Sequence, residues 1–288
     1  MTKWLDRLSG SWPGRFAAEL VERYFSHDVG RQAAALAYYL LFTLFPFLIF
    51  INSFLGLLRL DVSGLLGELR LLLPGQVLTL LETYLLYVEE TASPALFWFS
   101  LVFSVWFPMR AVRSLMGSVR RAYHLGTVKN RVWYSLKILL YTVTLLVTIA
   151  ATLLLTTVGR RALDFIFGML PLRLPQGFAE VWDLLRFGLL GVLVFGAVGL
   201  LYAMAQDTRQ KGSSILPGAL IALVVWMALS AGFSFYVAHF SNYSLIYGAL
   251  GTVIILIVWL YLTAVVLIMG AEVNDTLRSM TRPRRLER

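Results

Sequence analysis

Residues 242–277 read NYSLIYGALGTVIILIVWLYLTAVVLIMGAEVNDTL. The part from Ile246 to Gly270 holds no charged side chain, and nearly all of it is apolar, Gly or Thr. At about 1.5 Å per residue, roughly 20 such residues cross the ~30 Å hydrocarbon core of a bilayer. The stretch therefore predicts a transmembrane helix that ends in a cluster of Glu, Asn and Asp.

The composition of the whole chain is that of a membrane protein. Of its 288 residues, 59% are hydrophobic and 14% are charged, whereas soluble domains are about 45–50% apolar and about 25% charged. The absence of Cys excludes disulfides, thiolate metal ligands and a cysteine nucleophile. A net charge of +9 would suggest a nucleic-acid partner for a soluble protein. In a membrane protein it reflects basic cytoplasmic loops, so we expect no nucleic acid as a partner.

Further apolar runs lead us to expect an all-α, polytopic integral membrane protein with six transmembrane helices. Within a membrane domain over 32–277, the predicted spans are 33–58, 94–119, 136–158, 184–205, 215–238 and 245–270. Charges interrupt the apolar faces of 62–90, which predicts two amphipathic helices at the outer interface or, alternatively, a re-entrant hairpin. Residues 159–183 are expected to form an outer loop.

The two ends of the chain carry much of its charge. Residues 1–31 predict an amphipathic helix that either lies in the membrane interface or covers the cytoplasmic end of the bundle. Residues 278–288 form a basic tail. With the N-terminus inside, the predicted inner segments hold 19 Lys and Arg residues and the outer segments hold 6. This bias predicts that both termini are cytoplasmic.

Three arginines near the predicted cytoplasmic boundary are candidate binding residues. Arg110 and Arg113 lie in the inner part of the second span, and Arg31 precedes the first. Their side chains are expected either to reach lipid phosphates at the interface or to bind the anionic headgroup of a substrate.

The polar cluster Glu272, Asn274 and Asp275 ends the sixth span. The helix dipole disfavours carboxylates at this end of a helix. We expect one of the three arginines to offset the charge. The resulting ion pair either staples the bundle together or serves as a proton- or cation-coupling site.

Small, hydroxyl-bearing and helix-breaking residues mark candidate hinge, packing or groove-lining positions. Hinge or packing roles are expected at Pro46, Pro108, Gly248, Gly251 and Gly270. A threonine at every fourth position puts one stripe on the third span, which is either a packing seam or the lining of a hydrated groove. The stripe consists of Thr144, Thr148, Thr152 and Thr156.

Histidines and sequence motifs give no support for an enzyme. His27 and His124 lie in segments predicted to be inside, whereas His239 is predicted to be outside, so the three are not expected to form one site. Metal-dependent hydrolysis needs a cluster of His and carboxylate ligands. No P-loop, GxSxG or HExxH motif is present either. We therefore expect no catalytic residue, metal or cofactor.

Several motifs together resemble the YihY/BrkB family of bacterial inner-membrane proteins. They are RQAAALAYYLLFTLFP at 31–46, PGA at 217–219 followed by Trp226, YGALG at 247–251, WLY at 259–261 and GAEVN at 270–274. The resemblance extends over about residues 15–277. It implies a multi-pass protein of the inner, or plasma, membrane. The family has been labelled ribonuclease BN-like and a serum-resistance virulence factor, and it has been linked to envelope lipid transport.

Transport is the function that we expect from these observations. A bundle with amphipathic outer helices and boundary arginines suits a lipid or lipid-linked anionic amphiphile, with anionic membrane lipids as its partners. One alternative is a non-transporting envelope scaffold that binds a second copy of the chain or another envelope protein. A small-solute transporter is the second alternative, although no span places a charge at the bilayer midplane.

Overall fold

The secondary structure that can be described is helical throughout. The computed structural model describes residues 11–57, 75, 78–79, 81–83, 94–128, 130–169, 178–206, 215–240 and 249–281. Its helices are α2 (Trp12–Ser26), α3 (Val29–Leu57), α6 (Pro94–Ala122), α7 (Arg131–Met169), α8 (Phe178–Ala205), α9 (Leu216–Phe240) and α11 (Ala249–Thr281). Within these ranges there is no strand, so the all-α prediction is confirmed.

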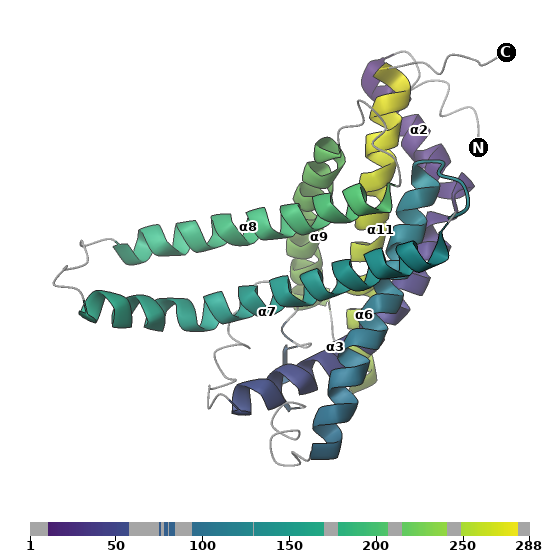
Figure 1. Cartoon of the computed structure of the whole chain (residues 1–288). Helices are drawn as coiled ribbons and strands as arrows, with labels where there is room; N and C mark the ends of the chain where they lie inside the picture. Colours follow the sequence, from purple (N-terminus) through teal and green to yellow (C-terminus); the bar gives the residue numbers. More distant parts are fainter. Residues whose placement is uncertain are drawn as a thin grey trace.

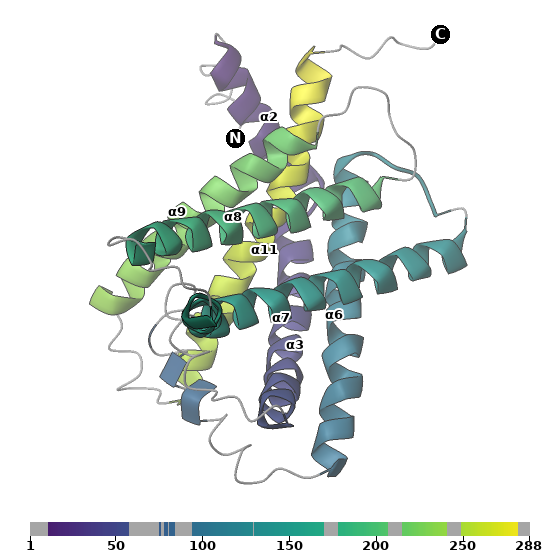
Figure 2. The same ribbon diagram turned by 60° about the vertical axis from the view of Figure 1, so that its left-hand side comes forward.

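The helices form two groups with different directions. α3, α6 and α11 run alongside one another, and α2 packs at the end of the molecule where α11 finishes (Figure 1). α7 and α8 run next to each other at a steep angle to these helices, and their far ends extend away from them (Figures 1 and 2). The start of α2 and the end of α11 therefore lie at the same end of the molecule.

In the described part of the chain, five helices are long and apolar enough to cross a membrane. The candidate segments are Val29–Phe50, Arg131–Ala150, Gly188–Ala205, Leu216–Val237 and Leu250–Thr281. α6, which contains the predicted second span, is 29 residues long but carries four arginines in its second half and is not among the five. The structure thus fits a polytopic membrane protein, while six spans with cytoplasmic termini stay a prediction.

The outer loop predicted over 159–183 is wrong at both of its ends. α7 continues to Met169, and α8 already begins at Phe178. The added part of α7 contains Arg160, Arg161 and Asp164, and charge alone does not end a helix. Proline does end helices, and the first proline after the third predicted span is Pro171. Most of 59–93, where amphipathic helices or a hairpin were predicted, lies outside the described residues.

The break between α2 and α3 lets α2 fold against the end of α11. α2 starts at Ser11, whose hydroxyl accepts a hydrogen bond from the Gly14 N–H at 3.3 Å. It ends at His27, and Asp28 then adopts a left-handed conformation with φ of 52°. Of the two interpretations of this segment, the structure shows a helix that packs on the end of the bundle.

α9 and α11 cross at two glycines. A Cβ on Gly218 would collide with the Gly270 carbonyl and would lie 2.6 Å from Asn274 Cγ. A Cβ on Gly270 would lie 2.8 Å from Ala222 Cβ. Further along the same interface, Trp226 Nε1 donates to Thr263 Oγ1 at 3.2 Å. The motif residues of the fifth and sixth predicted spans therefore pack these two helices together.

Candidate functional site

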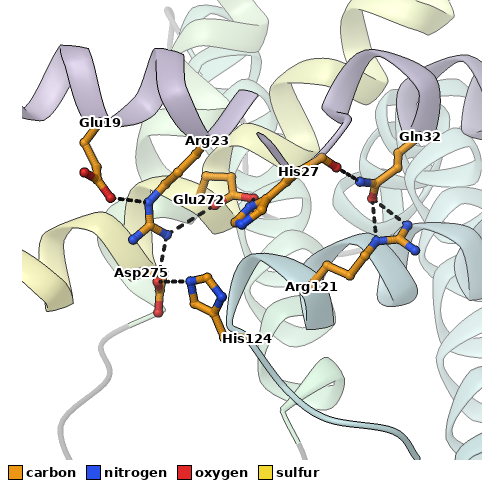
Figure 3. A network of polar contacts seen from close by, with 8 residues as sticks. All are labelled: Glu19, Arg23, His27, Gln32, Arg121, His124, Glu272 and Asp275. Carbon is orange, nitrogen blue, oxygen red and sulfur yellow. Dashed lines mark hydrogen bonds and ion pairs between the residues drawn. The ribbon is translucent and has the colours of Figure 1, made fainter. Parts of the chain in front are cut away.

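A buried arginine from α2 pairs with both carboxylates at the end of α11. Arg23 donates from one terminal nitrogen to Asp275 Oδ2 at 2.7 Å and to Glu272 Oε2 at 3.4 Å (Figure 3). Its Nε donates to Glu19 Oε1 at 2.8 Å on its own helix. Burial alone would lower the pKa of Arg23, but the hydrogen bonds to Asp275 and Glu19 outweigh it and raise the pKa, so the guanidinium stays charged.

The prediction that Arg31, Arg110 or Arg113 offsets the charge of the α11 carboxylates was wrong. None of Arg31, Arg110 and Arg113 contacts Glu272 or Asp275 in the described part of the chain. Arg31 instead pairs with Asp28 at 2.7 Å on the surface. The physical reason is the reversal at residues 27–28, which brings α2 rather than the start of α3 against the end of α11.

Two histidines complete the cluster of charged side chains. His27 Nδ1 lies 2.6 Å from Glu272 Oε1, and His124 Nε2 lies 3.5 Å from Asp275 Oδ2 (Figure 3). The two imidazole rings are 5.3 Å apart and nearly perpendicular. The expectation that the three histidines share no site holds for His239 near the far end of α9, but it is wrong for this pair. Among the described residues, no three His, Asp or Glu side chains are arranged to hold a metal ion.

The backbone that carries His124 is in a conformation that is unusual for this residue type. His124 follows α6 with φ of 52°, a region that favours Gly or Asn. Asp28, next to His27, has the same φ. These are the two non-glycine residues with positive φ in the described chain, and both are next to or within the charged cluster.

Two arginines in the last turn of α6 donate hydrogen bonds to the start of α3 and to the end of α8. Arg121 donates from Nε and a terminal nitrogen to Gln32 Oε1 at 3.1 and 2.6 Å, and the Gln32 amide in turn donates to the His27 carbonyl (Figure 3). Arg120 is buried and donates to the Ala205 carbonyl at 3.2 Å, at the end of α8. Both arginines lie in the last turn of α6, and each joins this helix to another one.

Asn274 has a structural role at the crossing of α9 and α11. Its Oδ1 accepts from the Gly218 N–H at 2.7 Å, and its Nδ2 donates to the Ile215 carbonyl and to the Tyr123 hydroxyl, both at 3.0 Å. Burial raises the pKa of Tyr123 to about 12, so the phenol remains neutral at physiological pH. Asn274 thus satisfies the first turn of α9, whose backbone groups would otherwise lack partners.

Arg110 and Arg113 lie elsewhere, on an exposed face of α6. The Arg110 guanidinium sits 5.1 Å from the centre of the Trp106 ring, and Arg113 donates to Ser135 Oγ of α7 at 3.2 Å. Within the described chain neither arginine has a carboxylate partner. The structure therefore brings these two candidates together and separates them from Arg31 and from the α11 carboxylates.

The remaining candidates are placed as follows. Thr144 and Thr148 donate their hydroxyls to carbonyls one turn back in α7, at 2.9 and 2.8 Å, which any exposed helical threonine can do. Thr152 is half-buried, and the Thr156 side chain and Gly248 lie outside what the structure describes. Pro108 and Gly251 are buried within α6 and α11. Pro46 lies inside α3, whose second half turns away from the direction of the first (Figure 1).

Sequence reasoning missed the side chains that α2 contributes. Glu19, Arg23 and His27 follow one another at four-residue spacing, which places them on one face of a helix. This polar stripe runs beside an aromatic one formed by Trp12, Phe16 and Tyr24, and it was the signal that both faces of α2 need partners. Nothing local pointed to Gln32, Arg121 or His124 as their partners.

The chain matches the family model described as Virulence factor BrkB over residues 20–288. The ribonuclease-like protein YfkH of Bacillus subtilis is 30% identical over 266 residues, which cover 91% of this chain and 94% of that protein. A UPF0761 membrane protein of Tolumonas auensis is 36% identical over 110 residues, or 35% of this chain and 36% of that one. The UPF0761 membrane protein YihY of Salmonella newport is 40% identical over 78 residues, 27% of each chain. No solved structure matches the chain significantly.

Proposed function

We propose, from the premise that the chain belongs to the family described as Virulence factor BrkB, that it binds an anionic lipid or lipid-linked amphiphile and moves it across the membrane. The family match and the five apolar helices make the chain a membrane protein. We further propose that this membrane is the bacterial inner membrane and that both termini are cytoplasmic, as the distribution of basic residues favours.

One exposed face of α6 carries the proposal. Trp98, Val102 and Trp106 are 63, 59 and 52% exposed, and they are followed at helical spacing by the exposed Arg110 and Arg113. These five positions are four, four, four and three residues apart, so they form one stripe. It is apolar and aromatic along its length and cationic at one end.

The dimensions and chemistry of this stripe suit an amphiphile. From Trp98 to Arg110 the helix rises by roughly 18 Å at about 1.5 Å per residue, close to the ~15 Å depth of one leaflet's hydrocarbon. Guanidinium groups bind phosphate oxygens through paired hydrogen bonds. Acyl chains can therefore lie along the aromatic part of the stripe while a phosphate contacts Arg110 and Arg113.

We do not extend the ribonuclease-like name of YfkH to this chain. Metal-dependent hydrolysis of RNA requires a cluster of His and carboxylate ligands that holds the metal. The sequence holds none of the motifs considered above, and the described side chains hold no such metal cluster. We therefore propose a role without catalysis.

Transbilayer movement of a fluorescent phosphatidylglycerol in proteoliposomes tests the proposal. The purified protein should accelerate movement, and the Arg110→Ala/Arg113→Ala variant should reduce the accelerated rate about tenfold or more, because charge-assisted hydrogen bonds contribute roughly 1.5–3 kcal/mol each. Arg15→Ala, which removes an exposed arginine from α2, is the matched control and should have no effect.

One result would reject this function: the folded wild-type protein accelerates neither phosphatidylglycerol nor phosphatidylcholine, which would favour a scaffold or another solute. A second result would reject the assignment of the lipid path to α6: the double variant transports as fast as the Arg15→Ala control.

A further inference from the structure

The two arginines of the proposed lipid-binding stripe lie deeper in the bundle than the boundary at which the sequence predicted them. α3 and α6 run side by side and antiparallel, with Gln32 hydrogen-bonded to Arg121 and the ring of Phe42 5.6 Å from that of Phe107 (Figure 1). By this register, residue 110 of α6 is level with about residues 39–43 of α3. The apolar segment of α3 is Val29–Phe50. Residue 110 is therefore level with the middle of a segment that is long enough to cross a membrane.

Neither guanidinium extends towards the end of the bundle where α2 packs. Between Arg121 and Arg113 the helix rises by roughly 12 Å, and between Arg121 and Arg110 by roughly 16 Å, at about 1.5 Å per residue. Helical side chains tilt towards the N-terminus of their helix, and the Arg110 guanidinium accordingly lies 5.1 Å from the ring of Trp106, one turn further from that end. Arg113 donates to Ser135, the fifth residue of α7, whose apolar segment starts with the helix itself. Both groups thus lie within the length of the apolar segments of neighbouring helices.

The described helices around these two arginines offer no carboxylate to balance them. α3, α6 and α9 contain no Asp or Glu, and α7 contains none before Asp164. The carboxylates of α8, Glu180 and Asp183, are in its first two turns, at the end that extends away from α6 (Figures 1 and 2). Those of α11 pair with Arg23, and Lys137 of α7 adds a further positive charge. Charged side chains inside a membrane are costly and rare, and they mark the paths of substrates or ions.

We infer that Arg110 and Arg113 form a binding site inside the hydrocarbon layer for the phosphate monoester headgroup of a lipid. The two residues are three positions apart on one helical face, so their guanidinium groups can donate to one phosphate. The aromatic part of the stripe holds the acyl chains. The inference rests on the proposed transport and names its substrate class: the headgroup occupies this site while it is partway across the membrane. It contrasts with the sequence-based expectation that no span places a charge at the bilayer midplane.

Charge balance favours the monoester over other phospholipid headgroups. A phosphate monoester carries about 1.5 to 2 negative charges at pH 7, which balance two guanidinium groups, whereas a phosphodiester such as phosphatidylglycerol carries a single charge. An uncompensated charge costs far more in apolar surroundings than in water. A site inside the hydrocarbon layer therefore discriminates between the two headgroups, whereas water would compensate most of the difference at the membrane surface.

Transport of two lipids with the same fluorescent label on the acyl chain tests this substrate class. At about pH 7.5, wild-type protein in proteoliposomes should accelerate phosphatidic acid about tenfold more than phosphatidylglycerol, after subtraction of the protein-free rates, because the monoester leaves the least net charge in the site. In Arg110→Gln and in Arg113→Gln one guanidinium remains, so the preference should disappear or reverse. Arg15→Gln, which removes an exposed arginine from α2, is the matched control and should keep the preference.

The outcomes separate this inference from the proposed transport. Equal acceleration of the two lipids by the wild-type protein would overturn the inference and leave lipid transport in place, and so would a preference that persists in both single variants. Acceleration of neither lipid would reject the proposed transport itself. Uptake of inorganic phosphate into the same vesicles should stay at the protein-free level. Uptake that depends on the two arginines would overturn the assignment to a lipid.

A depth measurement tests the location of the site without relying on transport. The chain has no native cysteine, so a nitroxide can be attached in Gly117→Cys, one turn after Arg113 on the same face, where an added Cβ meets nothing within 4 Å. Inside the hydrocarbon layer this nitroxide should be relaxed more strongly by oxygen than by a water-soluble nickel chelate. Thr127→Cys, exposed beyond the end of α6, is the control and should show the opposite order. A Gly117→Cys label that behaves like the control would place the arginines at the membrane surface and overturn the inference.

Discussion

The crossing of α9 and α11 gives a prediction whose size follows from the structure. In Gly218→Ala the new methyl group would collide with the Gly270 carbonyl and would lie 2.6 Å from the side chain of Asn274. The Gly270 carbonyl belongs to the backbone of a helix, so it cannot rotate away. The first turn of α9 must therefore separate from α11.

Two costs add at this position. Overpacking a tight site typically costs about 1–3 kcal/mol. Separation also breaks the 2.7 Å hydrogen bond from the Gly218 N–H to Asn274, and a buried donor left without its partner costs about 1–3 kcal/mol. The sum is about 2–6 kcal/mol. For a domain of this size about 1 kcal/mol lowers Tm by roughly 2–4 °C, so we expect a decrease of at least about 4 °C.

Thermal unfolding in detergent, followed by helical circular dichroism, measures the effect. Gly232→Ala is the matched control, since Gly232 lies on the same helix and its added methyl would meet nothing within 4 Å. This control should be neutral or slightly stabilising, because Ala favours a helix over Gly by up to about 1 kcal/mol. Equal Tm values for the two variants would refute the close approach of α9 and α11.

Two further predictions concern single side chains. Arg23→Met should destabilise the protein by about 3–5 kcal/mol, since it leaves buried carboxylates without their partner. Arg31→Ala should cost less than about 1 kcal/mol, because the pair with Asp28 is exposed. Urea titration measures the free energy of unfolding of both variants, and equal losses would contradict the burial of Arg23. Burial raises the pKa of Tyr123 to about 12, above its unfolded value near 10, so stability should fall as pH rises from about 10 to 12. Tyr123→Phe should lose less stability over that range, and an unchanged alkaline loss would show that another group causes it.

The helices were predictable wherever a continuous apolar run carried the signal. The run from Ile246 to Gly270 became the greater part of α11, and 215–238 lies within one residue of α9 at its first end and two at its last. The ends of α7 and α8 were not predictable in this way, because their outer turns are charged as well as helical. A hydropathy pattern detects the part of a helix that can lie in lipid, and the outer turns of α7 and α8 extend beyond that part.

The charged cluster was only half predictable, for a different reason. Glu272 and Asp275 were identifiable because carboxylates at the end of an apolar helix need a compensating charge. The partner of Glu272 and Asp275 is Arg23, which is 249 and 252 residues away in the sequence. Arg31 and Arg110 were equally plausible from local pattern alone. Only the reversal at Asp28, a backbone feature with no strong sequence signal, decides among them.

The charged cluster is connected through α6 to the proposed lipid-binding stripe. One face of this helix presents Arg110 and Arg113 to the exterior, and Arg121 in its last turn is hydrogen-bonded to Gln32. Gln32 donates to the carbonyl of His27, and His27 contacts the carboxylate of Glu272. An uninterrupted series of hydrogen bonds therefore joins the charged cluster to the helix that carries the proposed lipid-binding stripe. If α2 leaves α11, His27 moves with it, and Arg121 must either follow Gln32 or give up both of its hydrogen bonds to Gln32. α6 is thus the element through which a displacement of α2 would reach the stripe proposed to bind the amphiphile.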